Sequence, residues 1–333
     1  MSDMSQMNSL GCRILITEEI NAQGVQLLKD NGYEIRMGTG ISEDTVVREI
    51  EDCDAILTRN AIITEKIMLA SDRLKVVAMH GVGVDNIDIS AATRLGIWVV
   101  NAAHSNMVSV AEFTMGLILD LARNILPYDR RLRTGDWNVR RMIGTELAGK
   151  TLGVIGMGNI GSLVAKKAAA GFDMKVLAYK RTIAGARPIE GVSYTQDMDE
   201  VIRRADFLSL HVPYTPGTAE LIGARELSMM KPGAFLINTA RGEVVDESAL
   251  YETLRDKRIA GAAVDVFTGE IPKEDNPLLT LDNIIVTPHA AAFTAQAVAN
   301  MALHSALGVH EVLSGQEPTW SVNRPVCVNK VCV

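Results

Sequence analysis

Three side chains that could transfer a proton and bind an acid lie in the C-terminal half of the chain, each after a short apolar run. They are Arg241, Glu270 and His289. A histidine can exchange a hydroxyl proton near neutral pH, and a nearby carboxylate favours its protonated form. An arginine can hold a carboxylate in a bidentate fork and polarise an adjacent carbonyl. Together they suit the movement of a hydride to or from a carbon atom that carries oxygen.

Each of these side chains also has an ordinary structural interpretation. Arg241 could be a surface charge, Glu270 a loop acid and His289 a hydrogen-bonded turn residue. Ligands of open α/β sheets bind beyond the carboxyl ends of the strands. Because all three residues follow predicted strands, we expect them on one such edge, and this common placement favours the functional interpretation.

The turn GMGNIG follows an apolar run and opens a helical pattern, after which a second apolar run returns. Gly156 allows a tight turn, Gly158 lets the backbone approach a pyrophosphate, and Gly161 lets the helix pack on the strand. The helix start, with Asn159 and Ile160, offers N–H groups to phosphates. The pattern predicts a βαβ unit that binds a dinucleotide, and the alternative is a glycine-rich turn without a nucleotide.

The position that reads the adenosine ribose carries Lys180, Arg181 and Thr182. An NAD site usually has an acidic residue there, which accepts hydrogen bonds from the ribose. Two cations and a hydroxyl could instead bind a 2′-phosphate, so the sequence predicts that NADP(H) is favoured over NAD(H). The alternative is that these side chains point into solvent and the protein is indifferent between the cofactors.

The residues after the remaining strands are expected to complete the cofactor site. They are His211, Val212, Pro213, Thr239, Ala240, Arg241, His289 and Ala291. A second glycine-rich loop, HGVGVD, contains Val82 and Gly83 and could hold a small anion on its backbone N–H groups. An ordinary turn between a strand and a helix is the alternative for this loop.

Strands that alternate with helices must position these residues, and this alternation predicts parallel, doubly wound sheets. In the N-terminal part we expect strands at 13–17, 33–37, 55–58, 75–79 and 98–100, and helices at 22–31, 43–51, 65–70 and 90–95. In the second part we expect six strands, at 152–155, 176–179, 207–212, 234–238, 261–266 and 284–286. The remaining predicted elements are one helix at 107–126 buried nearly all round, a surface arm at 129–146 that exposes Trp137, and a helix at 294–313.

The composition narrows the class of protein. A chain of 333 residues with 47% hydrophobic content suggests two globular domains. A net charge of −7 argues against nucleic-acid binding, and the most apolar stretch, 107–122, contains charges that argue against a membrane span. The polar start argues against a secretory leader, and the four cysteines and six histidines show no metal-site spacing. We therefore expect a cytoplasmic protein with reduced thiols and no bound metal.

Four motifs, GMGNIG, NTARGEVVD, VDVFTGEIP and TPHAAA, closely resemble the D-isomer-specific 2-hydroxyacid dehydrogenases, over residues 12–313. The resemblance implies that Arg241 binds the substrate carboxylate and carbonyl and that Glu270 supports the acid/base His289. It implies that Asp265 binds the nicotinamide carboxamide. The implied substrate residues are Arg59, Val82, Gly83 and Arg241.

The resemblance also implies an architecture, in which a Rossmann-type cofactor domain at 104–290 is inserted in a flavodoxin-like substrate domain at 1–103 and 291–333. It implies a homodimer formed through the long helix and the arm. Two departures from the family pattern are Lys180 in place of the acidic ribose ligand, and Ile271 between Glu270 and Pro272.

The expected function is hydride transfer between NAD(P)H and a small 2-oxo acid or D-2-hydroxy acid, as in glyoxylate/hydroxypyruvate reductases. One alternative is a phosphoglycerate dehydrogenase-like activity, in which Arg59 meets a phosphate. The other is a non-catalytic, dinucleotide-sensing binding protein that resembles the family's corepressors. Formate dehydrogenases, which typically carry glutamine at the position of Glu270, resemble the chain less.

Overall fold

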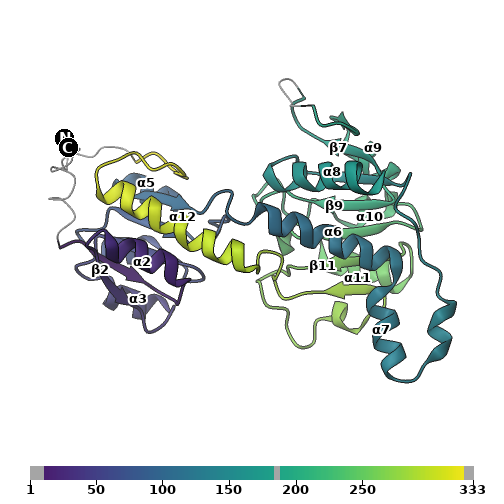
Figure 1. Cartoon of the computed structure of the whole chain (residues 1–333), viewed down its shortest axis with the longest axis horizontal. Helices are drawn as coiled ribbons and strands as arrows, with labels where there is room; N and C mark the ends of the chain where they lie inside the picture. The colour runs from purple at the N-terminus through teal and green to yellow at the C-terminus, as the bar shows by residue number, and fades with distance from the viewer. Residues whose placement is uncertain (1–10, 184–187, 326–333) are drawn as a thin grey trace. The chain divides into compact units, whose positions relative to one another are not determined.

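The computed structural model describes residues 11–183 and 188–325, and the chain divides into two compact units (Figure 1). The first unit comprises Met1–Asn106 and Phe293–Val333, and the second comprises Met107–Ala292. The first unit is therefore built from both ends of the chain, and the second from one continuous segment.

The first unit is a parallel five-stranded sheet in the order β2-β1-β3-β4-β5. Its strands are β1 (Arg13–Ile16), β2 (Glu34–Met37), β3 (Ala55–Thr58), β4 (Val76–Met79) and β5 (Trp98–Asn101). Its helices are α2 (Ala22–Asp30), α3 (Glu43–Glu49), α4 (Glu65–Leu69), α5 (Ile89–Leu95) and α12 (Ala295–Leu313). This strand order is that of the flavodoxin-like fold, which confirms the expected class.

The two faces of this sheet have separate apolar cores. Helices α2 and α12 pack against each other on one face, where Ile14 and Ile16 of β1 belong to the same apolar core as Ala302 and Ala306 of α12. On the other face, Leu15 belongs to a core that also includes residues of α3, α4 and α5. Alternate residues of one strand thus enter different cores, as the two-residue repeat of a strand requires.

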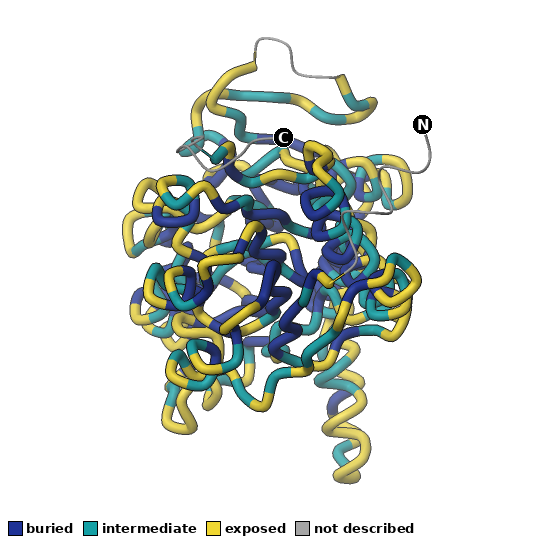
Figure 2. The backbone as a smooth tube through the Cα atoms, turned by 90° about the vertical axis from the view of Figure 1, so that its left-hand side faces the viewer, coloured by how far each residue is buried: buried dark blue, intermediate teal, exposed yellow. Residues whose placement is uncertain are grey.

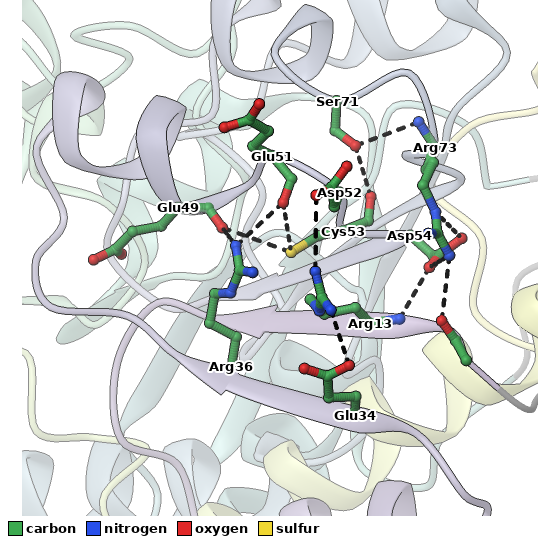
Figure 3. A network of polar contacts seen from close by, with 11 residues as sticks. Arg13, Glu34, Arg36, Glu49, Glu51, Asp52, Cys53, Asp54, Ser71 and Arg73 are labelled. Atoms are coloured by element: carbon green, nitrogen blue, oxygen red, sulfur yellow. Dashed lines mark hydrogen bonds and ion pairs between the residues drawn. The ribbon is translucent and has the colours of Figure 1, made fainter.

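A polar network closes the amino end of this sheet (Figure 3). The buried carboxylate of Asp54 accepts a hydrogen bond from the Arg13 backbone N–H at 2.9 Å and forms an ion pair with Arg73 at 2.8 Å. Arg36 of β2 donates to the backbone carbonyls of Glu49 and Glu51 at 2.7 and 3.1 Å. The Asp54 bonds join the start of β1 to the segments before β3 and β4, and the Arg36 bonds join β2 to the end of α3 and the turn after it.

The second unit is a parallel seven-stranded sheet in the order β12-β11-β10-β9-β6-β7-β8. Its strands are β6 (Thr151–Ile155), β7 (Lys175–Tyr179), β8 (Val192–Thr195), β9 (Phe207–Leu210), β10 (Phe235–Asn238), β11 (Gly261–Val264) and β12 (Ile284–Val286). Its helices are α6 (Met107–Arg123), α7 (Ile125–Arg133), α8 (Asn159–Phe172), α9 (Met198–Arg204), α10 (Ala224–Met229) and α11 (Glu247–Arg255), with short 3-10 helices η1 (Trp137–Arg141), η2 (Gly242–Val244) and η3 (Pro277–Thr280). The reversal of strand order at β6 is that of a Rossmann-type fold.

The expected count of six strands is wrong, because β8 adds a seventh at the sheet edge, paired in parallel with β7. The expected single helix at 107–126 is also wrong, since α6 ends at Arg123 and Asn124 has a left-handed backbone with φ of 55°. Asparagine tolerates this conformation better than most residues. The carboxylate of Asp120 then accepts a hydrogen bond from the Leu126 N–H at 2.8 Å and so caps the start of α7.

Burial in α6 is partial rather than all round, because Val108 is 48% exposed. The arm at 129–146 contains most of α7 and all of η1, and Trp137 is 73% exposed there. Across the chain, buried positions lie mainly on the strands and on the helix faces toward them, with exposed positions on the surrounding loops (Figure 2). Among residues 11–183 and 188–325, no helix is long and apolar enough to cross a membrane.

A C-terminal segment lies along the edge strand β5 of the first unit. The Asn101 N–H donates to the Trp320 carbonyl at 3.2 Å, and the Val322 N–H donates to the Val99 carbonyl at 2.8 Å. Asn323 is buried, and its side chain accepts from the Val99 N–H at 2.7 Å. The segment therefore covers part of the hydrogen-bonding edge of β5.

Candidate active site

The glycine turn after β6 has the close packing that the sequence predicts. Gly156 has φ of +102°, and a Cβ atom there would lie 2.4 Å from the His211 carbonyl oxygen. A Cβ atom on Gly161 would lie 2.0 Å from the Gly156 carbonyl oxygen. Gly158 caps α8 and has open space around it. The turn thus leaves the first N–H groups of α8, from Asn159 and Ile160, at a helix start that suits a phosphate.

The ribose-reading position lies after β7. The Lys180 N–H donates to the Thr195 carbonyl at 3.0 Å, and the Gln196 side chain donates to the Arg181 carbonyl at 2.7 Å. The backbone of this turn is therefore held by the strand β8 that sequence reasoning missed. Arg181 and Thr182 are exposed, and within the described residues no acidic side chain forms an ion pair with Lys180 or Arg181.

His211 follows β9 and lies against the glycine turn. Its Nε2 atom is 2.8 Å from the hydroxyl of the buried Ser209. Desolvation lowers the pKa of His211 to about 4, so the imidazole is neutral at physiological pH. Val212 also contacts the turn, since its Cγ1 atom lies 2.9 Å from the Cβ position of Gly156, whereas Pro213 is exposed.

The loop after β10 carries Arg241 and is shaped by the buried Asn238. The Asn238 side chain donates to the Arg241 carbonyl at 2.8 Å and accepts from the Ala240 N–H at 3.1 Å. The Thr239 hydroxyl lies 3.0 Å from that of Thr114 on α6, and both residues are buried. The asparagine of the N-x-x-R-G motif therefore fixes the backbone from which Arg241 projects.

Asp265, directly after β11, organises the loop that bears the histidine. Its buried carboxylate accepts hydrogen bonds from the Thr287 hydroxyl at 2.5 Å and from the backbone N–H groups of Ala290 and Ala291 at 2.8 and 2.9 Å. Its carbonyl accepts from the His289 N–H at 2.7 Å. The structure thus shows a function for Asp265 that the sequence did not reveal, which is to hold residues 287–291 in place.

The candidate acid/base pair is preformed. The Nδ1 atom of His289 lies 2.6 Å from the Oε1 atom of Glu270, and the two side chains are 43% and 65% exposed. Both residues have a left-handed backbone, with φ of 53° and 71° respectively. Such conformations are disfavoured for non-glycine residues and are concentrated at functional sites.

The expected substrate residues of the first unit lie at the carboxyl edge of its own sheet. Arg59 follows β3, and its guanidinium lies 4.9 Å from the ring centre of Phe293. Val82 and Gly83 follow β4, and the Val82 carbonyl accepts from the Asn101 side chain at 2.7 Å. The candidate cofactor and catalytic residues, by contrast, gather at the carboxyl edge of the sheet in the second unit.

One residue near the expected substrate residues of the first unit was not singled out from the sequence. His80 is buried, and neither ring nitrogen has a hydrogen-bond partner within the described part of the chain. Burial, with a smaller effect of Arg59, lowers its pKa to about 4. Among residues 11–183 and 188–325 no group of three or more His, Cys, Asp or Glu side chains could hold a metal ion.

Comparisons with known proteins identify the family. Residues 115–291 match the model of the D-isomer specific 2-hydroxyacid dehydrogenase, NAD binding domain. The chain is 43% identical over 315 residues to a D-3-phosphoglycerate dehydrogenase of Methanocaldococcus jannaschii. The matched residues make up 94% of this chain and 60% of that protein.

Solved structures of other proteins are also similar to this chain. A protein from Thermus thermophilus is similar with a TM-score of 0.86 at 33% identity, covering 93% of this chain and 100% of that one. An NADPH-dependent glyoxylate/hydroxypyruvate reductase from Sinorhizobium meliloti, in complex with NADP and malonate, is similar with a TM-score of 0.83 at 29% identity, covering 94% and 97%.

The chain spans from 56 to 60% of the length of three curated D-3-phosphoglycerate dehydrogenases that it matches. The family model covers more than half of the chain and includes the glycine turn, the arginine loop and the His289–Glu270 pair. This chain therefore belongs to the D-isomer specific 2-hydroxyacid dehydrogenase family, as the four sequence motifs predict.

Proposed function

We propose that the protein transfers a hydride between a nicotinamide dinucleotide and a small 2-oxo acid or D-2-hydroxy acid. The observation that carries this proposal is the 2.6 Å contact between His289 and Glu270, on the same sheet edge as the glycine turn. The cofactor fits this edge because Gly158 leaves open space at the start of α8, where N–H groups can bind phosphates. The second unit is accordingly proposed as the cofactor domain and the first as the substrate domain.

The chain's own residues account for the rest of the reaction. The dinucleotide, when bound, supplies or accepts the hydride at the substrate C2. In reduction His289 donates its proton to the substrate oxygen, and Glu270 stabilises the imidazolium before that transfer. Arg241 binds the substrate carboxylate and polarises the carbonyl. The remaining cofactor contacts are proposed for Asp265, Ala291, His211 and the 239–241 loop.

Replacing the proposed acid tests this assignment. The variant His289→Gln should bind the dinucleotide as the wild type does, while kcat falls by about a hundredfold or more, because general acid catalysis contributes that much. Steady-state kinetics and cofactor fluorescence titration measure the two quantities. Near-normal turnover in the variant would remove His289 from the mechanism.

For the substrate we propose glyoxylate or hydroxypyruvate, bound with the help of Arg59, Val82 and Gly83. A second candidate, phosphohydroxypyruvate, is favoured by the names of the curated relatives, and Arg59 would then meet the phosphate. A panel of 2-oxo acids assayed with NADPH and NADH decides between them. Strong activity on phosphohydroxypyruvate alone would reverse our ranking, and no turnover with tight dinucleotide binding would favour the corepressor-like alternative.

We also propose that NADP(H) is the preferred cofactor. The side chains of Lys180 and Arg181 have no acidic partner within the described residues and can bind a 2′-phosphate. Charge-assisted hydrogen bonds of about 1.5 to 3 kcal/mol correspond to roughly a ten- to a hundredfold preference in kcat/KM.

The variant Lys180→Asp should abolish that preference or reverse it. The control Lys166→Asp makes the same charge change at an exposed position of α8 and should leave the ratio unchanged. Equal use of NADH by the wild type, or an unmoved ratio in Lys180→Asp, would contradict this proposal.

A homodimer and a cytoplasmic location stay predictions. The arm supports the former, since Trp137 and Ile143 are 73% and 93% exposed and form apolar surface that a second copy could cover. Light scattering of the wild type and of Trp137→Ser would give the mass of each, and a monomeric wild type would contradict the dimer.

A further inference from the structure

The loop that carries Glu270 is held by an acidic side chain that follows the arginine loop in sequence. Glu247, at the start of α11, accepts a hydrogen bond from the Thr268 backbone N–H at 2.6 Å through Oε1. Through Oε2 it accepts another from the Asn276 side chain at 3.0 Å. Glu247 thus joins the two ends of the loop 268–276, within which Glu270 lies.

Two further contacts connect the same segments. The Oε1 atom of Glu243 is 3.3 Å from the N–H of Gly269, the residue before Glu270. A Cβ atom on Gly242 would lie 2.0 Å from the carbonyl carbon of Phe267 and 2.3 Å from the Thr268 nitrogen, so only glycine permits this approach. The segment 242–247 therefore contacts three successive residues that lead into Glu270.

The backbone of Glu270 needs such support. Gly269 and Glu270 are both left-handed, with φ of 76° and 71°, and this conformation is disfavoured for a glutamate. A disfavoured conformation persists when the surrounding structure determines it. Glu270 itself is 65% exposed at its side chain, so packing of that side chain contributes little to holding it.

We infer that Glu247 is a positioning residue for the acid/base pair, because it holds the loop that presents Glu270 to His289 and joins that loop to the segment 242–247, which follows Arg241. This inference rests on the proposed function, since it assigns a supporting residue to the same site. Neither the family resemblance nor the motif spacing assigns Glu247 any function.

The first experiment removes the contact and restores part of it. Glu247→Ala should lower kcat about tenfold with KM for the 2-oxo acid nearly unchanged, because misplacement of a catalytic group by a fraction of an ångström has effects of this size. Glu247→Gln keeps an oxygen that can accept from Thr268 and should stay within about threefold of the wild type. The matched control is Glu252→Ala, which removes an exposed glutamate of the same helix α11.

The second experiment distinguishes positioning from general loss of structure. In a Glu270→Gln background, Glu247→Ala should cause little further loss of kcat, because the group that it positions is already absent. A tenfold loss of kcat in both backgrounds would overturn the inference.

Failure of the proposed function gives a different result. If the wild type reduces no 2-oxo acid, the proposed function fails before any variant is made. If the wild type is active and Glu247→Ala equals the wild type in kcat, the proposed function stands and only the inference about Glu247 fails.

Discussion

His80 is a titratable side chain enclosed without a hydrogen-bond partner in the described part of the chain, beside the proposed substrate residue Arg59. Burial is the larger cause and the positive charge of Arg59 the smaller cause that together lower its pKa from 6.5 to about 4, while the negative charge of Glu18 acts in the opposite direction. The unfolded chain therefore binds a proton at His80 between these two pH values, and the folded chain does not. Stability from this group is complete above about pH 6.5 and is lost as the pH falls toward 4.

A leucine at this position should reduce the acid sensitivity. The free energy of unfolding of the wild type should fall by about 2 to 3 kcal/mol more than that of His80→Leu between pH 7.5 and 4.5, because one pKa unit corresponds to about 1.4 kcal/mol. Urea unfolding at both pH values measures this difference. The control His104→Asn removes an exposed histidine and should keep the wild-type pH dependence; an equal dependence in His80→Leu would show that His80 is not buried as neutral.

The sequence predicted the acid/base residues but not how they are supported. Arg241 and His289 were recognisable because their types and their places after strands indicate a site. The carboxylate of Asp265 holds the histidine loop through backbone N–H groups, and such contacts leave no spacing pattern in the sequence. The left-handed backbone of Glu270 is equally invisible, because glutamate is not a residue that favours it.

At the scale of elements, the packing of α2 on α12 depends on one missing side chain. A Cβ atom on Gly24 would lie 2.6 Å from the carbonyl oxygen of Ala302, whereas Gly171 near the end of α8 has nothing within 4 Å of that position. Two substitutions of the same kind are therefore expected to have opposite effects on stability.

Gly24→Ala should destabilise the protein by about 1 to 3 kcal/mol, as overpacking usually does. Gly171→Ala should stabilise it by about 0.5 to 1 kcal/mol, because alanine is the better helix former. Thermal and urea unfolding of both variants measure the two effects. Equal shifts of the same sign would mean that α2 and α12 do not approach as closely as the structure shows.

Element boundaries were the less predictable part of the fold. The break between α6 and α7 depends on the left-handed Asn124 and on the cap that Asp120 provides. Pro127 was a signal in the sequence that a new helix begins near it, because proline suits the first turn of a helix and not its interior. Strand β8 was missed because Val192–Thr195 is short, lies at the sheet edge and is partly exposed, so its pattern resembles a loop. The apolar central strands were predictable because burial on both faces of a parallel sheet dictates their composition. The glycine turn was predictable because the close approach of its backbone requires glycine.

At the scale of the molecule, the C-terminal segment around Asn323 forms hydrogen bonds with β5 and the turn before it, within the first unit. The Asn323 side chain accepts from the Val99 N–H at 2.7 Å and donates to the Ile97 carbonyl and the Thr93 hydroxyl at 3.0 Å each. Asn323→Ala leaves buried backbone groups of β5 and its preceding turn unpaired, and should destabilise the first unit by about 2 kcal/mol.

Limited proteolysis and urea unfolding would detect this change, with Arg324→Ala as the control because that side chain is 85% exposed. If both variants unfold like the wild type, the Asn323 side chain contributes nothing to the stability of the unit.

The discontinuous first unit has a consequence for the growing chain on the ribosome. Strands β1 to β5 emerge first, but the face that receives Ala302, Ala306 and Val309 stays open until α12 has been translated, after the whole of Met107–Ala292. At roughly 5 to 20 residues per second this interval lasts on the order of ten seconds or more. During that time the second unit can fold, whereas the nascent first unit displays apolar surface that a chaperone could bind. We expect ribosome profiling of chaperone occupancy to show binding that ends once α12 has left the exit tunnel.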